Sequence, residues 1–478
     1  MVSRLPPEIL QDIFKYNLCT KGPIFRSLKK SCLLVNRYWC HNAVSIIWEE
    51  PLNVCARSNF PAEDSKDDII QVYIKNLPRE SKALLRDAGI ISPALSEQSS
   101  TAINYASFLQ RIELQGLHEV STCWAIGSKC YSSSKYKETQ GRRLLLYREL
   151  CKLFISQSPN LKFSITLDCI KWNEFSHFQQ LSNIIPPNST LEKLICYTGH
   201  IKEIYESIGR MFTEIKDLSV NCNGDDNSGL NSLIDQMRET AWSLTISGTR
   251  RLPITDSFRK KIRLLTSLKI YSESELVPLE VFLECQFLKI LTVDGRSVDP
   301  SSVFNIINST HKTIQSLSII WYKETNLAKT KDHYLLLSSI PQNCPHLKKL
   351  FIPFTYATLH LIIEILNACN TLRYVKLMWH DYPVISKSDL FVWMENLGKS
   401  IPSSLQSLRI DGYMGLSVEA VDRFLDQCFW REVRSLKLEI DDWVSPDYYM
   451  EDGVDMSERH SKMLEKHISL GTLHESSR

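Results

Sequence analysis

Apolar and polar positions alternate in a short pattern that recurs through most of the chain. Each copy has the form L-x-x-L-x-L, in which a single, mostly polar residue separates the last two apolar positions. This alternation predicts a short strand that is buried on one side. The ten clear copies begin at Leu191, Ile215, Ala241, Leu265, Leu288, Ile314, Leu347, Leu372, Leu405 and Val433. Successive copies start 23 to 33 residues apart, near the period of roughly 20–29 residues that is typical of short-unit repeat proteins.

The segments between the strand copies predict helices. Residues 356–370 place Leu359, Ile362, Ile363 and Leu366 on one helical face, and residues 301–311 and 417–430 show the same spacing. Ser301 and Ser417 open two of these segments and suit an N-cap. One strand and one helix cannot bury their apolar faces alone, whereas stacked units bury a continuous core. The pattern therefore predicts an α/β fold, a curved solenoid with parallel strands on its concave face and helices on its convex face.

A different pattern occupies residues 5–48. Ile9, Leu10, Ile13 and Phe14 recur at a spacing that puts them on one face of a helix, and Pro6 and Pro7 stand where that helix begins. Further apolar runs lie at residues 28–35 and 44–48, with Trp39 between them. Three short helices bury few side chains among themselves, so we expect a partner to cover part of their apolar surface.

The order of these N-terminal residues resembles an F-box. The matching positions are the leucine–proline start, the isoleucine–phenylalanine pair, a valine followed by Trp39, and the closing Ile47-Trp48. Asn36 and Arg37 depart from the usual cysteine and lysine, and Ile47 replaces the usual leucine. The resemblance implies docking onto a Skp-type adaptor and, through it, a cullin scaffold. The adaptor-binding residues it implies are Leu5, Pro6, Ile9, Leu10, Ile13, Phe14, Leu28, Val35, Trp39 and Trp48. The alternative is an ordinary helical cap on a larger domain.

The strand–helix units resemble the leucine-rich repeat family over about residues 161–442. The phrase Cys344-Pro345-His346-Leu347-Lys348-Lys349-Leu350 is similar to repeats that commonly follow F-boxes. The family often has Asn or Cys at the ninth position of a unit, to bond the backbone of the turn. Here that position is Asn223 in one unit but Gly199, Arg296, Tyr322, Thr355, His380 and Tyr413 in others. We therefore expect a less regular backbone ladder than the family has.

Together the two resemblances imply a substrate-recognition subunit of a ubiquitin ligase that contains a Skp-type adaptor and a cullin. Such a protein holds a substrate and carries out no bond chemistry itself. A second interpretation is a repeat scaffold that binds an adaptor without ubiquitin transfer. A third is an enzyme with an unrecognised site.

The boundaries implied by these patterns divide the chain into four parts. Residues 1–50 are the F-box, and residues 51–160 are a helical or irregular connector with an exposed loop near 127–141. A partial repeat at Leu109 falls inside the connector, and a degenerate copy stands at Leu161. Residues 161–445 are the repeat solenoid, and residues 446–478 are a C-terminal cap or tail.

Composition narrows the range of partners and compartments. The 478 residues are 43% hydrophobic and 23% charged, as in a soluble globular protein, and the net charge of +2 favours neither nucleic acid nor a membrane surface. The 14 cysteines include no CxxC pair and no zinc-type spacing, which is typical of reduced cysteines. The N-terminus lacks the apolar run of a signal peptide, and no stretch has the length of a membrane span. We therefore expect a cytoplasmic or nuclear protein.

No pattern of catalytic residues is present. The sequence lacks a phosphate-binding glycine loop, HExxH, GxSxG and a kinase-type set. His177 and His380 belong to no cluster, and Cys196, Cys369 and Cys428 fall on apolar or helix-end positions that suggest packing. We therefore expect no enzymatic activity, no cofactor and no metal ion.

The outward-facing residues of the strands are the remaining candidates. Towards the C-terminus they mix cations with aromatic and apolar side chains, which suits contact with an acidic or phosphorylated protein. The candidate substrate-binding residues are Phe351, Tyr374, Lys376, Met378, Arg409 and Lys437. The alternative is an ordinary solvated strand face.

Overall fold

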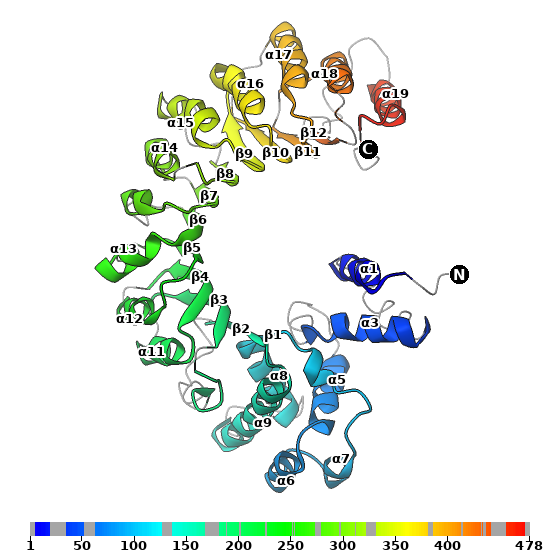
Figure 1. Cartoon of the computed structure of the whole chain (residues 1–478), viewed down its shortest axis with the longest axis vertical. Coiled ribbons are helices and arrows are strands. Elements are labelled where there is room, and N and C mark those ends of the chain that lie inside the picture. The colour runs from blue at the N-terminus through cyan, green and yellow to red at the C-terminus, as the bar shows by residue number, and fades with distance from the viewer. Residues whose placement is uncertain are drawn as a thin grey trace. The chain divides into compact units, whose positions relative to one another are not determined.

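The structure is a computed structural model of the whole chain (Figure 1). It describes residues 5–19, 35–51, 63–126, 136–167, 181–187, 189–199, 202–224, 227–250, 252, 254–272, 279–295, 298–310, 312–321, 331–380, 386–412, 414–431, 433, 436–440 and 456–473. Among these residues, no helix combines the length and the apolar character needed to cross a lipid bilayer.

All ten predicted strand copies are strands, and so are both weaker copies. The strands are β1 (Arg111–Glu113), β2 (Lys162–Thr166), β3 (Thr190–Tyr197), β4 (Glu214–Cys222), β5 (Trp242–Gly248), β6 (Leu265–Ser272), β7 (Ile290–Gly295), β8 (Ser316–Ile320), β9 (Lys349–Phe354), β10 (Tyr374–Trp379), β11 (Ser407–Asp411) and β12 (Lys437–Ile440). Their order in the 12-stranded sheet is their order in the sequence. The recorded pairs are parallel, so each unit returns the chain to the same end of the sheet.

Helices fill the segments between the strands. The N-terminal part has α1 (Pro7–Cys19), α3 (Arg37–Ile47), α5 (Glu63–Lys75), α6 (Arg79–Asp87), α7 (Pro93–Glu97), η1 (Tyr105–Phe108), α8 (Leu114–Ile126), α9 (Tyr136–Gln157), α11 (Lys202–Met211) and α12 (Ser228–Gln236). The C-terminal part has α13 (Asp256–Ile262), η3 (Leu279–Glu284), α14 (Pro300–Ser309), α15 (Lys331–Asn343), η5 (Tyr356–Thr358), α16 (Leu359–Ala368), α17 (Lys387–Ser400), α18 (Val418–Trp430) and α19 (Met456–Ser469).

The chain forms two compact units. One contains residues 1–217 and 228–238, and the other contains residues 218–227 and 239–478. This division falls within the repeated strand–helix pattern and not at residue 50 or residue 160. The three predicted domain boundaries are therefore not those of the compact units, and they stay predictions.

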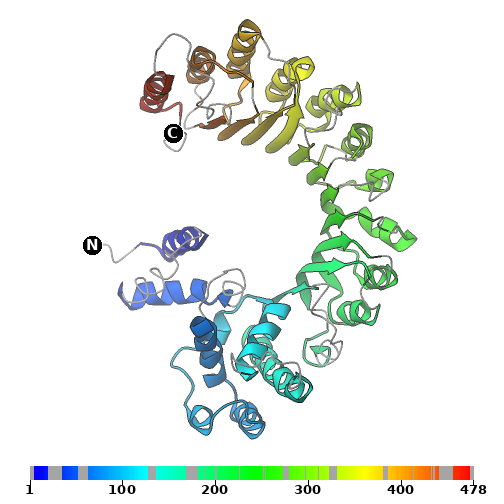
Figure 2. The same ribbon diagram turned by 180° about the vertical axis from the view of Figure 1, so that it is seen from behind.

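Strand alternation separates a core face from an open face. In β10, Val375, Leu377 and Trp379 are buried, while Tyr374 and Lys376 lie on the opposite face. Figures 1 and 2 show that the helices from α13 to α18 all lie on one side of strands β5–β12. We call the other side of these strands the open face. The α/β fold with a parallel sheet is therefore confirmed.

Side-chain hydroxyls join neighbouring units at the start of several strands. Thr313 Oγ1 donates to the Leu288 carbonyl over 2.7 Å, and Thr371 Oγ1 donates to the Leu347 carbonyl over 2.8 Å. Ser404 Oγ donates to the Leu372 carbonyl over 2.6 Å. Each bond satisfies a backbone acceptor of the preceding unit, which is the work that an asparagine ladder does in more regular repeats.

A close approach at one strand end requires glycine. Gly412 follows β11 with φ of 102°, a left-handed conformation that side chains rarely adopt. A Cβ atom there would lie 3.0 Å from both the Cβ and the carbonyl oxygen of Trp379. The absence of a side chain at Gly412 thus lets two neighbouring units pack at this edge.

Several local predictions need correction. Helix α9 begins at Tyr136, inside the predicted loop 127–141, because lysine, glutamate and glutamine favour a helix even without apolar spacing. Asp299, and not Ser301, caps α14, whereas Ser417 caps α18 as predicted. Ile363 is half-buried, and α16 instead buries Leu361 and Ile365 beside the predicted Leu359, Ile362 and Leu366.

Candidate functional site

Helices α1 and α3 form a pair with a small core of its own. Leu10 and Phe14 from α1 are buried against Ala43 and Ile47 from α3. Leu5, Trp39 and Trp48 pack around this cluster, and the rings of Phe14 and Trp39 meet edge to face with centroids 5.5 Å apart. Leu10 and Phe14 were predicted to contact an adaptor, but their side chains are 0% and 3% exposed and instead hold the two helices together.

Two polar contacts stabilise the N-terminal ends of α1 and α3. Asn36 is the N-cap of α3, because its Oδ1 accepts a hydrogen bond of 2.8 Å from the backbone N–H of Trp39. The Tyr38 hydroxyl donates to the carbonyl of Leu5 over 2.9 Å, which ties the start of α1 to α3. The asparagine that departs from the F-box pattern therefore starts a helix.

Several predicted adaptor residues are exposed and apolar. Ile9 and Ile13 on α1 are 48% and 39% exposed, and Val35 is 54% exposed just before α3. Pro6 is exposed, while Leu5 and Trp39 are half-buried. Leu28 lies outside the described residues. The side of α1 that does not face α3 thus carries two exposed aliphatic side chains, and we call Ile9 and Ile13 the N-terminal patch.

The end of α3 is held against the first strand of the sheet. Trp48 packs on Tyr73 and Tyr105, with ring centroids 5.4 Å and 4.3 Å away. The Arg111 guanidinium pairs with Glu49 at 2.8 Å and with Glu50. The backbone N–H of Arg111 also donates to the Glu49 carbonyl. Trp48, another predicted adaptor residue, is therefore half-buried at an internal junction.

The predicted substrate residues gather on the open face of β9 to β12. Register places Phe351, Lys376 and Arg409 side by side in one row across β9, β10 and β11. The row continues to Glu439 and not to Lys437, which pairs instead with Ser407. The L-x-x-L-x-L pattern is thus shifted by two residues between β11 and β12, because Leu408 pairs with Leu438 and not with Leu436. Leu436, just before β12, pairs with Leu473 from the C-terminal segment.

The cations of this row are paired with acids of the same face. Lys376 Nζ lies 2.6 Å from Asp411 Oδ2, and Arg409 Nε lies 2.5 Å from Asp411 Oδ1. Arg409 also reaches Glu439 at 3.3 Å, and Lys437 Nζ lies 2.5 Å from Glu439 Oε1. The hydrogen bond from Lys437 lowers the pKa of Glu439, and the charge of Arg409 adds to this effect. We call these five residues the charge network.

The charge network changes the interpretation of the predicted site. Three cations face two carboxylates, so most of the positive charge is balanced within the chain. Lys376, Arg409 and Lys437 are together as predicted, but they do not present an uncompensated basic surface. Met378 is half-buried and Tyr374 is exposed on the same face.

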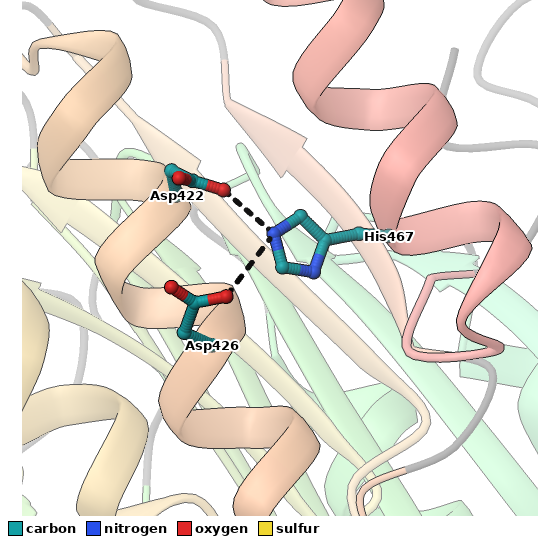
Figure 3. A group of neighbouring side chains, drawn as sticks. All are labelled: Asp422, Asp426 and His467. Carbon is teal, nitrogen blue, oxygen red and sulfur yellow. Dashed lines mark hydrogen bonds and ion pairs between the residues drawn. The ribbon is translucent and has the colours of Figure 1, made fainter.

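A second polar cluster lies between α18 and α19 (Figure 3). His467 is fully buried, and its Nε2 lies 2.8 Å from Asp422 Oδ1 but 3.9 Å from Asp426 Oδ1. Lys466 Nζ lies 2.9 Å and 3.1 Å from the same two carboxylate oxygens. Burial alone would raise the pKa of Asp422, but the hydrogen bonds from Lys466 and His467 outweigh it and lower that pKa.

The spacing of Asp422, Asp426 and His467 would also suit a metal ion. However, Lys466 already brings a positive charge between the two carboxylates. We therefore interpret this cluster as the contact that docks α19 onto α18. Sequence reasoning predicted a closing cap here but identified none of these four residues, because no pattern links residues 422–426 with residues 466–467.

The described cysteines in the repeats serve packing. Cys196, Cys369 and Cys428 are fully buried, as their positions predicted. Burial raises the pKa of the Cys369 thiol to about 11, and its Sγ lies 3.5 Å from the Cys344 carbonyl. A thiol that stays protonated at neutral pH is a poor nucleophile. His177 lies outside the described residues.

Comparison with protein-family models finds no match to this chain. Comparison with curated proteins likewise finds no match.

Proposed function

We propose that this chain is a substrate-recognition subunit of a ubiquitin ligase built on a Skp-type adaptor and a cullin. Its N-terminal helices bind the adaptor, and its repeat region binds a protein substrate. The chain itself supplies no reacting group. Its contribution is proximity, because holding a substrate raises the local concentration of its lysines near the charged conjugating enzyme.

The observation that carries this proposal is that α1 has both buried and exposed apolar side chains. Alternate pairs of side chains on one short helix either form the core with α3 or lie in solvent. Leu10 and Phe14 are buried, whereas Ile9 and Ile13 are exposed. Exposed aliphatic side chains on a helix that already has its own core are the mark of a surface that a partner covers.

The test is binding of a purified Skp-type adaptor to the full chain, measured by co-precipitation and by titration. Ile9→Asp with Ile13→Asp places charge in the N-terminal patch without touching Leu10 or Phe14. We expect binding to fall at least tenfold, because each aspartate would be desolvated at the interface. Val392→Asp is the matched control, since Val392 is also an exposed aliphatic residue on a helix, α17.

Unchanged adaptor binding in the Ile9 and Ile13 variant, with its helical circular dichroism intact, would falsify the proposal. A scaffold without ubiquitin transfer is the second candidate. It is favoured if the chain captures the adaptor but brings no cullin with it when all three proteins are mixed.

A further inference from the structure

Two lysines on the open face differ from those in the charge network. Lys269 on β6 and Lys349 on β9 both point away from the core, as the alternation of their strands requires. Neither forms an ion pair with any carboxylate in the described part of the chain. Lys349 Nζ instead lies 5.3 Å from the ring centroid of Tyr374. The two lysines of this face that form no ion pair with a described carboxylate therefore lie on β6 and β9, outside the charge network.

Exposed apolar side chains surround these two lysines. Tyr271 on β6, Ile290 on β7 and Tyr374 on β10 are 41%, 37% and 39% exposed. Register puts Ile290 and Lys349 in one row through Ser316, and Tyr374 is the next member of that row. Large apolar groups in solvent beside unpaired cations form a surface that suits an amphipathic ligand.

The distance between the lysines restricts what that ligand is. Strands β6 and β9 are three strand intervals apart, or about 14 Å at about 4.8 Å each. Lys269 shares its row with Phe351, and Lys349 stands two residues before Phe351, which adds an offset of about 7 Å along the strand. The two backbone positions are therefore about 16 Å apart.

A single phosphate cannot contact both lysines over that span. An extended peptide advances about 3.3 Å per residue, so two of its carboxylates about five residues apart would match the two ammonium groups. Between the lysines the surface offers small residues, Thr292, Ser316 and Ser318, which leave room for a peptide to lie across the strands.

We propose that strands β6 to β10 of the open face bind an extended peptide with two acidic residues about five positions apart and large apolar residues beside them. The acidic residues pair with Lys269 and Lys349, and the apolar residues pack on Tyr271, Ile290 and Tyr374. Only the identification of this peptide as part of a ubiquitination substrate rests on the proposed function. The binding chemistry does not depend on it.

The test probes an immobilised library of random decapeptides with the full chain in the absence of any adaptor. We expect enrichment of peptides with two Asp or Glu residues four to six positions apart and an aromatic or aliphatic residue between them. Lys269→Glu with Lys349→Glu should weaken the selected peptides at least tenfold and shift the preference to basic residues. Lys269→Gln with Lys349→Gln, a milder change, should weaken them about fivefold in total.

Two controls separate a local site from a general charge effect. Lys260→Glu with Lys331→Glu makes the same change in net charge on exposed helical lysines and should leave the selection unchanged. Lys376→Gln with Arg409→Gln removes cations of the charge network and should change binding less than twofold. The inference is overturned by a library without enrichment, by selection of basic or purely apolar peptides, or by equal losses in the Lys260 and Lys331 variant.

Because no adaptor is present, this outcome is independent of the adaptor titration. Peptide selection without adaptor binding would leave the open-face site standing and remove the ligase role. Adaptor binding without peptide selection would leave the ligase role standing and remove the open-face site.

Discussion

The docking of α19 can be tested by two substitutions that differ in a single hydrogen bond. Asp422 and Asp426 lie one helical turn apart on α18, with side chains 37% and 35% exposed, and both contact Lys466. Only Asp422 lies within hydrogen-bonding distance of the buried His467, at 2.8 Å against 3.9 Å. Asp422→Ala and Asp426→Ala therefore change the same helix and the same lysine contact, but only the first leaves His467 without its partner.

The expected magnitudes follow from exposure. An ion pair that is about a third or more exposed contributes about 0.2–1 kcal/mol, so loss of the Lys466 contact should cost each variant about 0.5 kcal/mol. A buried donor left without an acceptor costs about 1–3 kcal/mol more. Asp422→Ala should thus weaken the docking of α19 by about 2.5 kcal/mol and Asp426→Ala by about 0.5 kcal/mol. The gain in helix propensity on replacing aspartate with alanine is the same in both variants and cancels in the comparison.

Native-state hydrogen exchange reads this difference locally, which matters because the chain has two compact units and need not unfold in one step. Amides of α19 should exchange about 70-fold faster in Asp422→Ala and about twofold faster in Asp426→Ala, while amides of α16 should not change. Equal acceleration in the two variants would show that His467 is not held by Asp422.

Four further outcomes are expected. Because the pKa of Asp422 is lowered on folding, its contribution to α19 docking is present above about pH 4, the unfolded pKa of an aspartate. That contribution is lost as pH falls through the lower folded pKa. Exchange of the α19 amides should therefore show this pH dependence in the unsubstituted chain and not in Asp422→Ala. Gly412→Ala should cost about 2 kcal/mol in urea unfolding, whereas Gly415→Ala, also at positive φ but with open space around it, should cost about 1 kcal/mol. Thr371→Val should cost about 1 kcal/mol by removing its bond to the Leu347 carbonyl, and Thr371→Ser should restore most of the loss. Addition of Zn²⁺ or EDTA should leave the melting temperature unchanged, because Lys466 already pairs with both carboxylates between α18 and α19; a zinc-dependent rise would favour a metal site.

The strands were predictable because their signal is local. Side chains in a strand alternate between two faces, so a leucine pattern such as that around Leu372 identifies both the strand and its buried side. The period between copies then predicts parallel stacking, since a single unit cannot bury its core alone. Even the weak copy at Leu109, with β1 at its centre, joins the sheet beside β2.

The features that sequence reasoning missed depend on contacts between units. Thr313 and Thr371 precede a strand copy by one residue, and their hydroxyls bond a carbonyl 24 or 25 residues upstream. The hydroxyl residues before these two copies are visible in the sequence, but only the structure shows what they bond. The irregular ninth position predicts a weak ladder at the strand ends, and these hydroxyls add bonds between units at the strand starts.

The N-terminal helices show that a motif match alone does not separate core residues from surface residues. The residues that resemble an F-box include some that form the core of the pair, such as Leu10, and some that lie in solvent, such as Ile9. Both kinds are needed for the pattern, one to build the helices and the other to offer a surface. Asn36 breaks the pattern yet satisfies a backbone donor at the start of α3. An asparagine suits this position because it caps the helix, and a motif comparison does not consider capping.

On the open face, the sequence likewise does not show which charged residues are paired with one another. Lys376 and Arg409 are predicted to bind because cations beside aromatic groups suit an acidic partner, but the sequence does not show that both cations pair with Asp411. Asp411 lies within 2.6 Å of both cations, because β10 pairs with β11 in the case of Lys376 and because Arg409 stands two residues before Asp411 on β11 itself. A charge that is already neutralised has less to gain from a ligand than one that is not, since binding must first break the existing pair. The proposed binding surface therefore lies at β6 and β9 and not at the charge network, since Lys269 and Lys349 form no ion pair with any described carboxylate.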